Sequence, residues 1–107
     1  MIEYIGNIEL DEKLEDKKLV IYGIGEFGRK IYKFLKNNGL QANVLCFCVS
    51  DNENAKCNIF QNIQVKTLSE AIKMSPDAEY LIGGKYAYEM LDELERRHIN
   101  KIHLLFL

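Results

Sequence analysis

Three glycines near the start of the chain have the spacing of a phosphate-binding loop. They stand in the run Gly-Ile-Gly-Glu-Phe-Gly, which matches the pattern G-x-G-x-x-G. Between a strand and a helix, the first glycine makes the turn, the second lets the backbone approach a pyrophosphate, and the third packs the helix on the strand. The helix N-terminus then faces the anion. We therefore expect phosphate contacts from Gly23, Ile24, Gly25, Glu26, Phe27 and Gly28; the alternative is that Gly25 and Gly28 serve packing only.

A hydroxyl and a carboxylate follow the next apolar run, at Ser50 and Asp51. A dinucleotide site has an acid about 20 residues after the glycine loop, where it binds ribose hydroxyls. A carboxylate there would repel a 2′-phosphate, so Asp51 favours a ribose without phosphate over NADP. The alternative is an ordinary residue at the start of a loop that caps nearby N–H groups.

A second glycine turn, Gly83-Gly84-Lys85, follows the apolar run 79–82. Open α/β sheets bind ligands at the carboxyl ends of their strands. Gly83 and Gly84 would leave backbone exposed there, and Lys85 would reach a phosphate. The alternative for Lys85 is a solvated residue in the first turn of a helix.

No arrangement of residues indicates a metal site or a catalytic centre. Cys46 and Cys48 lie on the same face of an expected strand and Cys57 in the following loop, without the second ligand pair of a zinc site. Buried free thiols are the expected state, and no metal is predicted. Tyr86 and Tyr88 are the only candidates for an acid or base, so the catalytic residues stay unknown.

The elements that position these residues follow from the apolar pattern. Strands are expected at 18–22, 44–49, 63–67, 79–82 and 101–107, and helices at 26–38, after Thr67 and at 85–97. Thr67 and Glu70 form a capping-box pattern. This alternation predicts an α/β fold, a Rossmann-like three-layer sandwich with a mostly parallel sheet in the order 3-2-1-4-5, counted along those strands.

Composition limits the class of protein. The 107 residues predict a single domain at 18–107, after an extension at 1–17 in which residues 10–17 could form a small helix. With 14 Lys and Arg against 16 Asp and Glu, no basic surface for nucleic acid is expected. No apolar run reaches membrane-spanning length and no secretion signal is evident, so we expect no membrane partner and a cytoplasmic location. Three cysteines agree with a reducing compartment.

Four segments together resemble a known family: the run 19–35, the strand end 47–51, the short strand 63–65 and the helix start 68–71. They are similar to the Rossmann-like domains of bacterial sugar O-acyltransferases of the sialic-acid acetyltransferase type and of related surface-polysaccharide proteins. The resemblance covers about residues 18–107. It implies a domain that binds the nucleotide part of a nucleotide-sugar through Gly23, Gly25, Gly28, Ser50 and Asp51. The sequence lacks the hexapeptide repeats that hold acetyl-CoA in those enzymes, so acyltransferase activity is not implied.

Three functions stay open at this point. The preferred one is a nucleotide-binding module, for NAD or a UDP-sugar, that acts with a partner such as a transferase domain or with further sequence. The others are a minimal NAD-dependent oxidoreductase and a structural or dimerisation domain with an empty cleft. Because the apolar strand 101–107 would lie at the sheet edge, we also expect that edge to be covered, by residues 1–17, by a second copy in a homodimer or by sequence that follows in a longer protein, with the homodimer slightly preferred.

Overall fold

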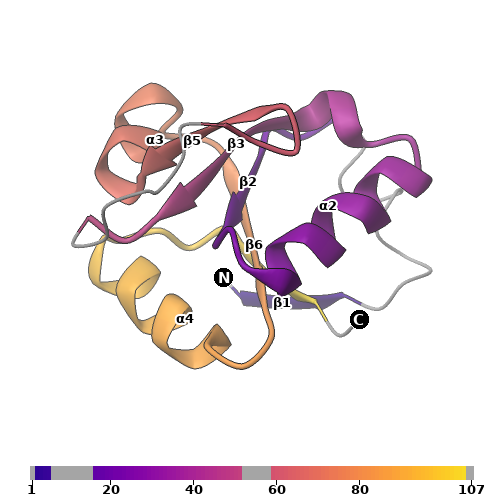
Figure 1. The fold of residues 1–107 in the computed structure, drawn as a ribbon. Helices are drawn as coiled ribbons and strands as arrows, with labels where there is room; N and C mark the ends of the chain where they lie inside the picture. Colours follow the sequence, from indigo (N-terminus) through magenta and orange to yellow (C-terminus); the bar gives the residue numbers. More distant parts are fainter. Residues whose placement is uncertain (1, 6–15, 52–58, 106–107) are drawn as a thin grey trace.

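The computed structural model describes residues 2–5, 16–51 and 59–105. These residues form a seven-stranded sheet in the order β1-β7-β6-β2-β3-β5-β4 (Figure 1). The strands are β1 (Ile2–Ile5), β2 (Leu19–Tyr22), β3 (Val44–Val49), β4 (Ile59–Phe60), β5 (Ile63–Thr67), β6 (Glu79–Gly83) and β7 (Ile102–Leu105). The helices are α2 (Glu26–Asn37), α3 (Leu68–Met74) and α4 (Ala87–Arg96), with a 3₁₀ turn, η1, at Gln41–Asn43.

The expected α/β class is confirmed, whereas the description of the sheet needs correction. A strand is added at each edge, because β1 pairs with β7 and β4 pairs with β5. The sheet is mixed, since β4 runs antiparallel to β5 while the other pairs are parallel. The five expected strands form its middle, in the order β5-β3-β2-β6-β7. The short β4 was missed because its two residues are too few to show a periodic pattern.

Helices cover both faces of the sheet, as the continuous apolar strands require. Leu19 and Ile21 of β2 pack toward α2, where Ile31 and Leu35 are buried. Val20 and the other residues of the opposite face pack toward α3 and α4. Figure 1 shows α2 on one side of the sheet and the other two helices on the opposite side.

The edge beside β7 is covered by the chain itself. β1 pairs in parallel with β7, with Ile2 opposite Ile102 and Ile5 opposite Leu105. The preference for a homodimer as the cover of this edge was therefore wrong, since the amino-terminal strand takes that place. Ile2–Ile5 also belongs to the sheet rather than to an extension before it. The helix considered at 10–17 falls mostly outside the described residues.

Local capping fixes the start of α3 as the sequence predicts. The Thr67 side chain accepts a hydrogen bond from the Glu70 backbone N–H at 3.2 Å, and the Glu70 carboxylate accepts one from the Thr67 N–H at 2.9 Å. This reciprocal pair satisfies two N–H groups that a helix start leaves without partners. It holds α3 at the carboxyl end of β5.

We expect the thiols of β3 to be unreactive in the folded protein. Cys46 and Cys48 are fully buried, and burial raises the pKa of Cys46 to about 11 and that of Cys48 well above its ordinary value. Little thiolate, the reactive form, is then present near neutral pH. A Cys57→Ser variant should give almost no thiol titration at pH 8 in native buffer and two thiols in guanidinium. Rapid native titration of both would contradict their burial.

None of the described helices has the length and apolar character needed to cross a bilayer.

Candidate functional site

A cleft of about 490 Å³ opens at the carboxyl ends of β2 and β6. Its volume lies within the range of small-molecule sites, about 300 to 1,000 Å³. The glycine loop and the start of α2 form one wall, and the turn between β6 and α4 forms the other. The lining residues are Tyr22, Gly23, Ile24, Gly25, Glu26, Phe27, Gly28, Lys30, Ile31, Gly83, Lys85, Tyr86 and Met90. The whole predicted phosphate loop therefore faces one cavity.

Two of the three loop glycines are required by the fold itself, one by its backbone conformation and one by close packing. Gly23 has a φ of +106°, which side chains rarely adopt, and its N–H donates to the Cys48 carbonyl at 2.8 Å. A Cβ on Gly28 would lie 2.3 Å from the Gly23 carbonyl oxygen, so only glycine lets α2 approach the loop. Packing, the alternative considered for Gly28, is thus a sufficient reason for this glycine.

Gly25 has no such reason within the described residues. It has a φ of −79°, which any residue adopts, and a Cβ built there meets nothing within 4 Å. The same residue is the N-cap of α2, a position where Ser, Thr, Asp or Asn would add a hydrogen bond. Among the residues that the structure describes, no side chain caps this helix start. Neither the packing of the described residues nor the φ of this position requires a glycine, and Gly25 lines the cleft at the helix N-terminus.

The second glycine turn packs against Phe27. Gly84 is exposed as expected, whereas the expectation of exposed backbone was wrong for Gly83, which is buried. A Cβ on Gly83 would lie 2.3 Å from the Phe27 ring, and one on Gly84 would lie 2.8 Å from it. Gly84 also has a φ of +83°. The ring thus packs where two side chains are missing and joins the start of α2 to the β6–α4 turn. Gly83 still lines the cleft, whereas Gly84 does not.

Charged and aromatic groups surround the opening of the cleft. Lys30 and Lys85 contribute positive charge and Glu26 contributes negative charge, and all three are exposed. The ammonium of Lys85 lies 5.4 Å from the centre of the Tyr86 ring, in cation–π range. Tyr86 is 58% exposed although it borders the cleft. Tyr88, the other candidate acid or base, is outside this lining and 76% exposed.

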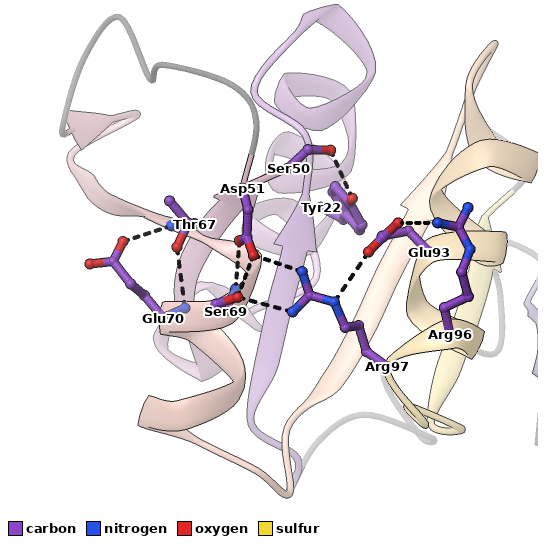
Figure 2. Close-up of polar contacts among 9 residues, drawn as sticks. All are labelled: Tyr22, Ser50, Asp51, Thr67, Ser69, Glu70, Glu93, Arg96 and Arg97. Carbon is purple, nitrogen blue, oxygen red and sulfur yellow. Dashed lines mark hydrogen bonds and ion pairs between the residues drawn. The ribbon is translucent and has the colours of Figure 1, made fainter.

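A second cleft, of about 350 Å³, adjoins the first. Tyr22, Gly23, Tyr86 and Met90 line both, while Val49, Ser50, Glu89, Glu93 and Arg96 line only the second. The Tyr22 and Ser50 hydroxyls are hydrogen-bonded at 3.0 Å (Figure 2). Ser50 is thus brought to the candidate site, at the end of β3.

Asp51 is held in a polar network (Figure 2). It lines neither of the two clefts. Its carboxylate accepts hydrogen bonds from the Ser69 N–H at 2.9 Å, from the Ser69 hydroxyl, and from the Arg97 guanidinium at 2.7 Å. Arg97 also donates to Ser69 at 3.0 Å and to Glu93 at 3.2 Å. The Ser69 hydrogen bonds, followed by Arg97, lower the pKa of Asp51 to about 2. The carboxylate expected to bind ribose thus lines neither cleft, and it joins the residues that follow β3 to α3 and to Arg97 at the end of α4.

Several residues of the site were not singled out from the sequence. Tyr22 could have been predicted, because the last residue of a strand before a glycine loop lies at the carboxyl edge of the sheet. Met90 lies on α4 at a position that reads as an ordinary apolar residue of a helix, and it lines both clefts. Arg97 gave no local signal, since its partner Asp51 is far away in the sequence.

The Asp51 network predicts a pH dependence of stability. A carboxyl whose pKa is lowered by folding stabilises the folded state above its unfolded pKa, near 4, and this contribution is lost as the pH falls through about 2. Asp51→Asn should therefore lower the urea midpoint at pH 7, and the difference from wild type should shrink between pH 4 and pH 2. Glu95→Gln, on an exposed side of α4, is the control. A difference that does not change with pH would contradict this role.

No family model matches this chain, and no curated protein matches it significantly. The resemblance to acyltransferase domains therefore stays a prediction. Among the described residues, no group of three or more His, Cys, Asp or Glu side chains is placed to hold a metal ion. Cys57 lies outside the described residues.

Proposed function

We propose that this domain binds the diphosphate of a nucleotide, NAD or a nucleotide-sugar such as a UDP-sugar, on the glycine loop at the start of α2. The observation that carries the proposal is Gly25. Its φ and the free space around it accept a side chain, yet glycine stands at the position where a phosphate would need the backbone N–H groups. The packing of the described residues does not require a glycine at position 25, whereas a phosphate bound to the backbone N–H groups would require one.

The charges around the cleft support an anionic ligand of modest charge. The first N–H groups of a helix have no partner within the helix and carry part of its positive dipole. Lys30 and Lys85 line the same cleft and add two cations, which Glu26 offsets in part. The exposed Tyr86 ring offers a flat apolar face to a base or a sugar.

The biological setting is proposed from the sequence resemblance. A nucleotide-binding domain of this kind would act with a partner, such as a transferase domain, or with further sequence, in sugar or surface-polysaccharide metabolism. A minimal oxidoreductase is the second candidate, because Tyr86 borders both clefts and would be its acid or base. Oxidation of NADH on addition of a carbonyl substrate, lost in Tyr86→Phe, would favour the second candidate.

The test is a thermal-shift panel with NAD, NADP, UDP, UDP-sugars, CMP-sugars and S-adenosylmethionine. A ligand present at 100 times its Kd should stabilise the fold by about 2.7 kcal/mol, a shift of several degrees for a domain this small. Adenosine and uridine, which lack phosphate, serve as controls and should shift the midpoint little. Stabilisation by no nucleotide would contradict the proposal and favour a structural domain with an empty cleft.

A further inference from the structure

The second cleft has the chemistry of a sugar subsite rather than a phosphate subsite. We propose that it binds the hydroxyls of the sugar next to the diphosphate, and that Glu89, in the first turn of α4, accepts hydrogen bonds from a pair of neighbouring hydroxyls. This inference rests on the proposed function, since it assumes a diphosphate on the glycine loop. It assigns to Glu89 the role that the sequence suggested for Asp51.

The two clefts are placed to hold parts of one ligand. They share four lining residues, Tyr22, Gly23, Tyr86 and Met90. Gly23 belongs to the glycine loop itself, so the second cleft begins directly beside the proposed phosphate position. A sugar bonded to that diphosphate is the part of a nucleotide or nucleotide-sugar that lies within such a short reach.

The existing ion pairs leave Glu89 as the available acceptor. Glu93 accepts hydrogen bonds from Arg96 at 3.0 Å and from Arg97 at 3.2 Å (Figure 2). Arg96 also donates to Asp92 at 3.1 Å. Glu89 is exposed and lines the cleft. Within the described part of the chain, its carboxylate makes no hydrogen bond or ion pair. Two carboxylates against one guanidinium make this cleft unfavourable for a phosphate.

Hydroxyl groups complete the subsite. The Tyr22 and Ser50 hydroxyls lie at the wall of the second cleft, 3.0 Å from each other. Hydroxyls both donate and accept, as sugar hydroxyls do. A carboxylate accepts from two neighbouring hydroxyls at once, through its two oxygens, which gives charge-assisted hydrogen bonds stronger than neutral ones. The diol belongs either to a nucleoside ribose or to a hexose attached to the diphosphate.

The test measures affinity by calorimetry for wild type, Glu89→Gln and the matched control Glu95→Gln, which makes the same change on the same helix outside both clefts. The probes are NAD, UDP-glucose and UDP. Glu89→Gln should weaken NAD, UDP-glucose or both about tenfold, whereas Glu95→Gln should bind as wild type does. If the affinity for UDP also falls, the diol belongs to the nucleoside ribose. If only the affinity for UDP-glucose falls, it belongs to the hexose.

Two outcomes would overturn the inference, and they are distinguishable. If Glu89→Gln binds every probe as wild type does while Gly25→Val binds none, the second cleft is not the sugar subsite but the proposed function stands. If wild type binds none of the probes, the proposed function fails and this inference fails with it. Glu89→Gln also removes a negative charge from the first turn of α4, which by itself would lower stability without changing affinity. Urea unfolding of both glutamine variants measures this effect on stability separately.

Discussion

Gly25→Val is expected to abolish nucleotide binding and to leave the fold intact. The substitution places a branched side chain where the cleft is open and the phosphate would lie, at a residue whose φ of −79° accepts valine. Two lost hydrogen bonds to a charged group, at about 1.5 to 3 kcal/mol each, weaken binding by about a hundredfold or more. Calorimetric titration of the folded variant with the ligand that stabilises wild type most measures this loss.

A graded series makes this result specific. Gly25→Ala, with a single added carbon, should weaken binding less than Gly25→Val does. Both variants should stay folded and lose no more than about 1 kcal/mol of stability, the usual scale of an N-cap change, because nothing described lies within 4 Å of the added Cβ. Wild-type affinity in the valine variant would contradict a phosphate at this loop.

Gly28→Ala is expected to destabilise the fold strongly, although the change is smaller. The new Cβ would lie 2.3 Å from the Gly23 carbonyl oxygen and 3.0 Å from its carbon, and backbone cannot move aside as a flexible side chain can. Helix propensity alone would favour alanine by about 1 kcal/mol. We expect a net loss of about 3 kcal/mol, near the upper end of overpacking costs, and a midpoint lower by about 10 °C or more.

Gly25→Ala is the matched control for this prediction, since it makes the same change three residues earlier in the same loop. The two alanine variants should therefore separate the roles of the glycines. Gly28→Ala should lower the stability of the fold, whereas Gly25→Ala should lower the affinity for the nucleotide. Equal thermal midpoints for Gly28→Ala and wild type would show that α2 does not need this close approach to the loop.

Much of the fold could be predicted because its signals are local. The continuous apolar runs of β2 and β3 and the Thr67–Glu70 capping box each depend on residues close in the sequence, and these elements form as expected. The edges of the sheet could not be predicted in this way. The pairing of β1 with β7 joins the two ends of the chain, and no short pattern in either strand indicates its partner.

The candidate site likewise has a part that local sequence predicts and a part that depends on distant contacts. The glycine loop is a local motif and lies at a cleft as predicted. The role of Asp51 depends on Arg97, 46 positions away, whose guanidinium forms an ion pair with that carboxylate. Gly83 and Gly84 likewise depend on Phe27, whose ring fills the space above them. Where a distant side chain decides a residue's role, the spacing of the motif could not indicate it.

Amide NMR shifts during titration with the nucleotide that stabilises the protein most test the central claim most directly, because they report where the diphosphate lies. If the glycine loop binds it, the largest saturable shifts should belong to the backbone N–H groups of Gly25, Glu26, Phe27 and Gly28. The amides of Asp51 and Ser69, in the network outside both clefts, should shift less. Largest shifts elsewhere, with the loop amides unchanged at saturation, would contradict diphosphate binding at the start of α2.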